Sequence, residues 1–378
     1  MNKQYKSETD AENNPTKIVG DERLKSIPLV ARLLRRPELG ALSGLVVILI
    51  FFAFTASSKM FTLYGFISIG APAAQLGILA VAAAMLMIGG EFDLSIGSTL
   101  AFTGMIFGAC IVYWDISVLG AVLITIIVAM LIGFVNGQIV LRTGLPSFIV
   151  TLAGLFVYKG ATLVGLKMIT GITLISGVNT KAGEGWMVQL FSGNAFESSF
   201  AWMASQGWIA TFKNGTPKVK GIPVEMIWVL LIVIVATYIL SRTNFGNWIF
   251  ASGGDAEAAR TTGVPVNRVK TFLFMGTSVA AALVAIITVL TVGTADTLRG
   301  TQKEFEAIIA AVIGGCFLMG GYGSAIGALI GAIIFGIVKI GLAYTSFDLD
   351  NFLIFLGAML LVAVFFNNFI RRFVTREG

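Results

Sequence analysis

Long apolar runs separated by short polar breaks dominate the chain between residues 39 and 370. A membrane-spanning helix needs about 20 mostly apolar residues, because a charge at the bilayer centre is costly. This pattern predicts an all-α polytopic membrane protein with about ten transmembrane helices. They are expected at 39–56, 66–88, 94–114, 117–141, 146–166, 225–240, 271–293, 306–320, 324–344 and 350–370. The runs at 225–240 and 306–320 are short for an upright helix, so tilted or re-entrant forms stay open.

Composition supports a membrane protein. Of 378 residues, 56% are hydrophobic and 12% are charged, and the mean hydropathy is +0.89, so too few polar groups exist to coat soluble globules. The chain contains no His, which excludes Ser-His-Asp triads and His-ligated metals. Cys110 and Cys316 lie far apart in apolar runs and form no CxxC motif. No metal or other cofactor is expected.

Basic residues predict the orientation in the membrane, since cytoplasmic loops are enriched in Lys and Arg. Eight lie in the tail 1–38, four in the loop 241–270 and three in the tail 371–378, whereas the longer segment 167–224 holds five. We therefore expect both tails and 241–270 in the cytoplasm, the membrane domain at 39–370 and segment 167–224 outside. The net charge of +6 then reflects this bias, with no need for nucleic acid.

The outer segment 167–224 contains Trp186, Trp202 and Trp208 among small and polar residues. Tryptophan favours the membrane–water interface. One or two helices lying flat on the outer surface, or an ordinary ordered loop, fit this pattern equally well.

Two Gly-rich stretches resemble each other. IGGEFDLSIGS begins at Ile88, and IGGCFLMGGYGSAIG begins at Ile313. Each has a double glycine, a broken stretch and a small-residue turn before a Gly-rich span. Many transporters consist of two related halves, but chance similarity between Gly-rich apolar sequences explains the match as well.

The inner segment ASGGDAEAARTTGVPVNRVK at 251–270 predicts a two-turn helix. Gly253 and Gly254 would free the backbone, Asp255 is a good N-cap, and Gly263 and Pro265 stop the helix. A helix this short is marginal alone, so it packs against its own protein or a partner. No GxxxxGK[ST] motif occurs, so energy for transport would come from an ion gradient or a partner.

The same segment resembles the coupling loop of ABC importer permeases, and more narrowly that of the ribose/xylose-type sugar importers. Three further stretches agree in order: GGEFDLSIGS at 89–98, TGLPSFIVTLAGLFVYKGATL at 143–163, and KEFEAIIAAVIGG at 303–315 running into GGYGSAIGALIGA at 320–332. The resemblance covers most of residues 40–370. The outer segment 167–224 is longer than expected for ribose-type members.

This resemblance implies a permease subunit in a bacterial inner membrane that performs no catalysis. It implies a cytoplasmic ATPase that supplies the work, a periplasmic binding protein that delivers a pentose, hexose or sugar alcohol, and a second permease subunit, all within membrane lipid. The residues implied at the ATPase contact are Gly254, Asp255, Glu257, Ala258, Ala259, Arg260 and Gly263.

Polar residues in or beside the spans are candidates for the pathway or its gate. The candidates are Glu91, Asp93, Asn136, Gln138, Thr151, Tyr158 and Glu306. Asp93 could instead cap a helix that begins at Leu94, and interhelical hydrogen bonding explains the others as well. Glu304 and Glu306 are expected near the outer end of their span.

Gly323, Gly327 and Gly331 have the spacing for close helix packing, expected within the subunit rather than between subunits. Several other functions stay open. An amino-acid or nucleoside permease fits the same resemblance. A secondary carrier would need more ionisable residues inside its spans, and a membrane enzyme lacks a nucleophile–base pair.

Overall fold

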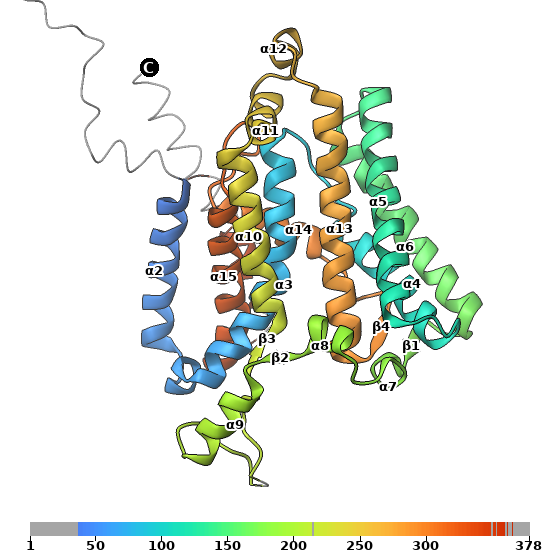
Figure 1. The fold of residues 1–378 in the computed structure, drawn as a ribbon. Coiled ribbons are helices and arrows are strands. Elements are labelled where there is room, and N and C mark those ends of the chain that lie inside the picture. The colour runs from blue at the N-terminus through green and yellow to red at the C-terminus, as the bar shows by residue number, and fades with distance from the viewer. Residues whose placement is uncertain are drawn as a thin grey trace, which may run out of the picture.

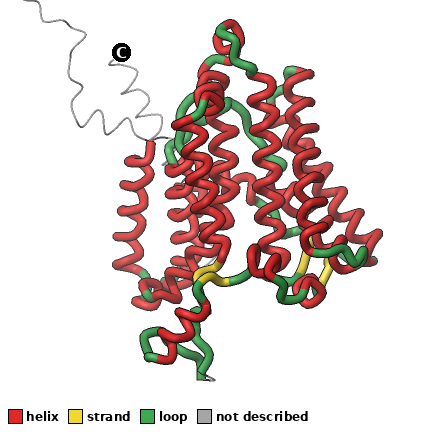
Figure 2. Tube along the Cα trace, viewed as in Figure 1, coloured by secondary structure: helices red, strands yellow, loops and turns green. Residues whose placement is uncertain are grey.

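The computed structural model describes residues 37–213, 215–348, 351–352, 354–359, 361 and 365. These form a bundle of helices (Figures 1 and 2). The longer helices are α2 (Pro37–Thr55), α3 (Leu63–Ile88), α4 (Ile96–Val112), α5 (Val118–Thr143), α6 (Ser147–Thr170), α10 (Val224–Arg242), α11 (Asn244–Gly254), α13 (Val266–Val292), α14 (Lys303–Ile313) and α15 (Ala325–Gly341). The shorter ones are η2 (Ser58–Phe61), α7 (Val178–Ala182), α8 (Trp186–Ser192), α9 (Glu197–Ser205), α12 (Ala256–Thr261) and η3 (Leu342–Tyr344).

Seven helices in the described part are long and apolar enough to cross a membrane: α2, α3, α5, α6, α10, α13 and α15 with η3. The expected ten spans are therefore not all present as full-length helices. Helix α4 has 17 residues and begins at Ile96 rather than Leu94. The tails 1–36 and 371–378 and most of the expected span 350–370 lie outside the described residues.

The run at 306–320 does not form a full-length span, and its short helix agrees with the re-entrant alternative. Helix α14 has 11 residues, about 16 Å at 1.5 Å per residue, which is half of a hydrocarbon core about 30 Å thick. It ends because Gly314 and Gly315 follow, and Gly315 has φ +88°, a left-handed conformation that most side chains avoid. The next residues form an irregular linker that reaches α15 at Ala325.

Helices α3 and α13 form the core of the bundle. In the most apolar 18-residue stretch of each helix, 72% of α3 and 78% of α13 is buried, against 11% of α2 and 22% of α6. Helix α13 packs mainly on α5 and α4, and α15 packs on α3. Close contact with α5 depends on Gly133, where a Cβ atom would lie 2.6 Å from Met275 Cα of α13. Helix α2 stands at the edge of the bundle (Figure 1).

The two Gly-rich stretches share a local turn. After α3, the amides of Gly89, Gly90 and Glu91 bond to carbonyls four, three and five residues back. The amides of Gly314, Gly315 and Cys316 do the same after α14. The next helices then begin after Ser95 and Ser324, respectively. The predicted relation between two halves thus has a matching backbone at its centre, although the linkers differ in length.

The segment 167–224 lies at the end of the bundle opposite α12 (Figure 1). It carries α7, α8 and α9. Two antiparallel strand pairs also form here, β1 (Leu174–Ser176) with β4 (Thr294–Asp296) and β2 (Asn194–Ala195) with β3 (Ile222–Pro223). Helix α9 and its neighbouring loop project beyond the bundle (Figure 2) around the buried residues Phe200, Ile209 and Val219. The segment is therefore neither a plain loop nor only one or two flat helices.

Candidate functional site

After the turn that ends α3, the linker to α4 continues over residues 91–95 without helical structure and runs into the bundle (Figure 1). Backbone amides inside a membrane protein need partners, because hydrocarbon supplies none. Two hydroxyls of α6 provide them. The Phe92 amide donates to Ser147 Oγ and the Leu94 amide donates to Thr151 Oγ1, both at 3.0 Å. Helix α6 therefore holds the linker in place.

Asp93 in this linker is 2% exposed. Its Oδ1 accepts hydrogen bonds from the Ser95 amide at 2.9 Å and the Ser95 hydroxyl at 2.6 Å, and its Oδ2 accepts one from Thr277 Oγ1 at 2.7 Å. All three donors are neutral. The prediction that Asp93 caps a helix from Leu94 is wrong in register, because Ser95 occupies the N-cap position and Asp93 binds that residue instead.

Asn136 of α5 extends the same chain of hydrogen bonds. Its Nδ2 donates to Ser95 Oγ at 3.0 Å, and its Oδ1 accepts from the Tyr158 hydroxyl of α6 at 2.8 Å. Asn136 is buried, whereas Tyr158 is half-buried. We call this set the Asp93 network. Its members are Asp93, Ser95, Asn136, Ser147, Thr151, Tyr158 and Thr277.

Glu91 lies outside the Asp93 network and forms an ion pair with Lys270 of α13 at 2.5 Å. The two side chains are 13% and 10% exposed. The next residue of α13, Thr271, accepts a hydrogen bond from Gln138 Nε2 at 3.1 Å. Both predicted pathway residues therefore bind the first turns of α13. Removing one partner of a buried pair leaves an uncompensated charge, which is strongly destabilising.

Glu306 does not join the Asp93 network. It pairs with Lys303 at 2.5 Å and with Lys339 of α15 at 3.6 Å. Glu304, in contrast, is 6% exposed and lies against Gly97, where a Cβ atom would overlap its carboxylate. A carboxylate beside the first turn of α4 is favourable because the amide dipoles there point their positive ends outward.

The segment between α10 and α13 contains the predicted short helix. The Asp255 Oδ1 caps α12 by accepting from the amides of Glu257 and Ala258 at 3.0 Å each. Gly263 follows the helix with φ +87°. Of the residues implied at the ATPase contact, Ala259 is buried and faces its own protein; the others are exposed: Gly254, Asp255, Glu257, Ala258, Arg260 and Gly263.

Gly253 and Gly254 do not free the backbone, because they are the last residues of α11. A Cβ atom on Gly253 would overlap the carbonyl oxygen of Ile88 at the end of α3. The glycine therefore permits close contact between two helix ends. Gly327 and Gly331 act likewise between α15 and α14, where Cβ atoms would overlap the carbonyls of Gly314 and Ala310. Gly323 precedes α15 and faces Cys316.

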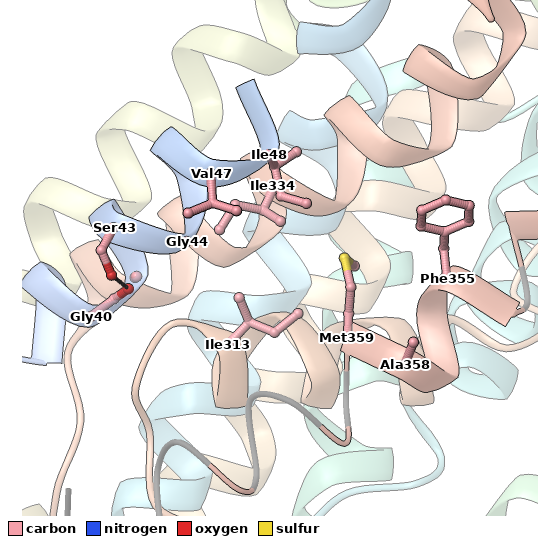
Figure 3. A pocket seen from close by; sticks show the side chains of 11 residues that line it. Gly40, Ser43, Gly44, Val47, Ile48, Ile313, Ile334, Phe355, Ala358 and Met359 are labelled. Atoms are coloured by element: carbon pink, nitrogen blue, oxygen red, sulfur yellow. Dashed lines mark hydrogen bonds between the residues drawn. The ribbon is translucent and has the colours of Figure 1, made fainter. Parts of the chain in front are cut away.

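An apolar cavity of about 380 Å³ lies between α2, α14, α15 and the described residues near 355–359 (Figure 3). Ser43 carries its one polar side chain and donates to the carbonyl of Gly40 at 2.8 Å. The other lining residues are Gly40, Ala41, Gly44, Val47, Ile48, Ile313, Ile334, Phe355, Ala358 and Met359. None of these lining residues belongs to the Asp93 network, so this cavity is separate from it.

Several residues of the site carried no signal that single-sequence reasoning could use. Ser95, Ser147 and Thr277 are small hydroxyl residues in apolar surroundings, where they often bond only to their own helix. In the sequence, Lys270 is one of the basic residues of loop 241–270 that predict the orientation in the membrane. Lys270 and Glu91 are 179 residues apart in the sequence, so the sequence alone does not reveal that they form an ion pair.

Comparisons with known proteins identify the family. Residues 65–364 match the family described as branched-chain amino acid transport system, permease component. The chain belongs to this family. It is thus a transport permease rather than an enzyme.

Characterised relatives of this permease include two sugar permeases. The xylose transport system permease protein XylH of Escherichia coli K12 is 28% identical over 88% of this chain and 91% of its own. The ribose import permease protein RbsC of the same strain is 32% identical over 85% and 91%, and RbsC of Haemophilus influenzae is 33% identical over 78% and 81%. No solved structure matches the permease.

Proposed function

We propose that this permease forms the membrane pathway of an ABC importer for a neutral sugar. The observation that carries the proposal is the Asp93 network, which gathers hydroxyl and amide groups from the linker, α5, α6 and α13 inside an otherwise apolar bundle. The relatives named for xylose and ribose support the same cargo.

The chemistry of the Asp93 network suits a hydroxylated solute. Hydroxyl and amide groups both donate and accept hydrogen bonds, as each sugar hydroxyl does. Tyr158 adds a half-buried ring at the end of the chain of bonds, with Phe102 6.4 Å away between ring centres. The donors to Asp93 and Asn136 are all neutral, which suits an uncharged cargo.

Energy for import comes from a cytoplasmic ATPase that binds the exposed face of α12, with Glu257 and Arg260 as its central charged contacts. The excess of Lys and Arg in 1–38, 241–270 and 371–378 supports a cytoplasmic location for this end and for both termini in a bacterial cell. The opposite end, with α7, α8 and α9, then receives sugar from a periplasmic binding protein.

A second copy of the permease completes the pathway. Lys159 lies near the middle of α6 and is exposed, although a charge in contact with lipid at that depth is costly. Helix α6 leans away from the bundle (Figure 1) and buries little of its surface. A second subunit and a wet pathway against this face would remove Lys159 from the lipid.

The test is uptake by the whole importer. The permease is expressed with a candidate ABC ATPase and a candidate sugar-binding protein from the same genome, in a strain that lacks its own pentose and hexose importers. Labelled xylose, ribose, a hexose, a sugar alcohol and leucine are compared. We expect ATP-dependent uptake of one sugar or sugar alcohol, and uptake of leucine alone would refute the proposal.

Coupling is tested in the same cells. Glu257→Ala combined with Arg260→Ala should remove ATPase binding and uptake. The matched control, Glu184→Ala with Lys218→Ala, removes the same two charges from exposed sites at the opposite end and should leave ATPase binding unchanged. Full uptake by the α12 variant would contradict a role for α12 in coupling.

A further inference from the structure

Three backbone segments meet directly below α12 with no side chain between them. They are the end of α3, the end of α11 and the linker that leads to α15. A Cβ atom on Gly253 would overlap the Ile88 carbonyl oxygen and lie 2.8 Å from the Gly321 amide nitrogen. The Gly321 amide also donates to that same Ile88 carbonyl at 2.9 Å. The segments are therefore packed backbone against backbone.

Gly320 and Gly90 complete this glycine junction, which we define as Gly90, Gly253, Gly320 and Gly321. A Cβ atom on Gly320 would lie 2.6 Å from the Gly253 carbonyl oxygen and 2.8 Å from Gly90 Cα. Gly90 and Gly320 have φ values of +82° and +81°, a conformation that favours glycine over other residues. A side chain at Gly253 or Gly320 would force these segments apart.

A second contact joins the same two parts of the chain beyond α12. Lys270, in the second turn of α13, binds Glu91, which follows Gly90 in the linker. The segment 253–270, which contains α12, is therefore attached to the α3–α4 linker at both of its ends. The first attachment is packing between Gly253 and Gly90, and the second is the ion pair.

The attached linker leads straight to the Asp93 network. Asp93 lies two residues after Glu91, and its partner Thr277 lies seven residues after Lys270, two turns along α13. The linker and α13 are thus joined at two successive points, first by the Glu91–Lys270 ion pair and then by the hydrogen bond from Thr277 to Asp93. Packed interiors transmit displacement because they are dense and hardly compressible.

We propose that Gly253 and the Glu91–Lys270 pair are positioning residues that carry motion of α12 to the Asp93 network. When an ATPase moves α12, the end of α11 and the start of α13 move with it. The α3–α4 linker then moves with them, because it packs directly on the backbone of Gly253 and is bound to Lys270 by a buried ion pair. Asp93 and Ser95 then shift against Asn136, which changes the path for the solute. This inference rests on the proposed function.

The experiment measures how many sugar molecules enter proteoliposomes per ATP hydrolysed by the complete importer. Gly253→Ala should lower this ratio by about tenfold while ATPase binding is retained, because the binding face of α12 is unchanged; tenfold corresponds to about 1.4 kcal/mol of lost coupling. The matched control is Gly276→Ala on α13, where a Cβ atom meets nothing within 4 Å, and it should leave the ratio unchanged. An unchanged ratio for Gly253→Ala, or loss of ATPase binding, would overturn the proposal.

The ion pair gives a second test that does not depend on the folding of the glycine variant. Glu91→Lys and Lys270→Glu alone should each lower the ratio by about tenfold, since each leaves like charges in a poorly solvated site. The double exchange should restore it to within about twofold of the parent. Single variants with the parent's ratio, or a double variant no better than the singles, would refute the coupling role.

The experiment distinguishes failure of the proposed function from failure of the coupling proposal. If the proposed function fails, the parent importer itself takes up no sugar. Failure of the coupling proposal leaves a parent that transports sugar and variants that transport it with equal efficiency.

Discussion

The Thr277 hydroxyl of α13 donates a hydrogen bond to Asp93 Oδ2 at 2.7 Å, although 184 residues separate the two in the chain. This contact fixes an irregular linker to the most buried helix of the bundle. The Thr277 hydroxyl has one proton, and the alternative acceptor for it is the Phe274 carbonyl of its own helix at 2.9 Å. Its contact with the carboxylate is the one that depends on tertiary structure.

Thr277→Val should therefore destabilise the permease. Asp93 would lose one of three donors to a buried carboxylate, and a hydrogen bond to a charged group contributes about 1.5–3 kcal/mol. We expect the free energy of unfolding in detergent to fall by about that amount. Thr288→Val is the matched control, because Thr288 lies on the same helix and its hydroxyl donates to the carbonyls of Val284 and Ala285 of that helix. Equal losses for both variants would contradict a special role for the Asp93 contact.

Tyr158→Phe should slow sugar uptake without unfolding the permease. The change removes only the hydroxyl that donates to Asn136 Oδ1 at 2.8 Å. A neutral hydrogen bond contributes about 0.5–1.5 kcal/mol, so the initial uptake rate should fall by about two- to tenfold. Tyr238→Phe, on the exposed side of α10, should transport like the parent. If the Tyr158→Phe variant takes up sugar at the parent's rate, the Tyr158 hydroxyl has no role in the pathway.

Local rules predicted the parts of the fold that depend on neighbouring residues. Asp255 was expected to cap a short helix and does so, because capping involves only the next three residues. The similarity of IGGEFD and IGGCFL likewise reflects one turn formed by a double glycine. Apolar length correctly placed the helices near 66–88, 117–141 and 271–293.

Contacts between distant segments could not be predicted in this way. The run 306–320 is apolar enough for a span, but its double glycine ends the helix at Ile313, a consequence that hydropathy ignores. The sequence predicts backbone flexibility at Gly253, whereas a Cβ atom there would overlap the carbonyl oxygen of Ile88, far away in the sequence. The pairing of Glu91 with Lys270 arises only once α3 and α13 lie side by side.

Asp255→Ala should weaken ATPase binding, provided that α12 forms the contact. Loss of an N-cap costs about 1 kcal/mol, and a two-turn helix has little other stabilisation. The Kd for the ATPase, measured by titration of the purified permease in nanodiscs, should rise by about fivefold. Asp255→Asn preserves a capping oxygen and should stay close to the parent. If both variants bind the ATPase as tightly as the parent does, the cap does not support the contact, whereas equal loss of binding in both would point to the charge of Asp255 itself.

Gly133→Ala provides a direct test of the packing between α5 and α13. In an isolated helix, alanine is more favourable than glycine by about 0.5–1 kcal/mol. At Gly133, however, the added Cβ would lie 2.6 Å from Met275 Cα and 2.7 Å from the Phe274 carbonyl carbon, and neither backbone atom can move without shifting α13. Overpacking of this kind costs about 1–3 kcal/mol, so the variant should unfold more readily.

Gly160→Ala in α6 is the matched control, because a Cβ atom there meets nothing within 4 Å. It should leave the free energy of unfolding unchanged or raise it by up to about 1 kcal/mol through helix propensity alone. Opposite signs for the same substitution would show that close backbone contact, rather than flexibility, requires glycine at residue 133. Because α13 also carries Lys270 and Thr277, a shifted α13 should in addition lower sugar uptake, and normal uptake by a destabilised Gly133→Ala permease would mean that the Asp93 network tolerates such a shift.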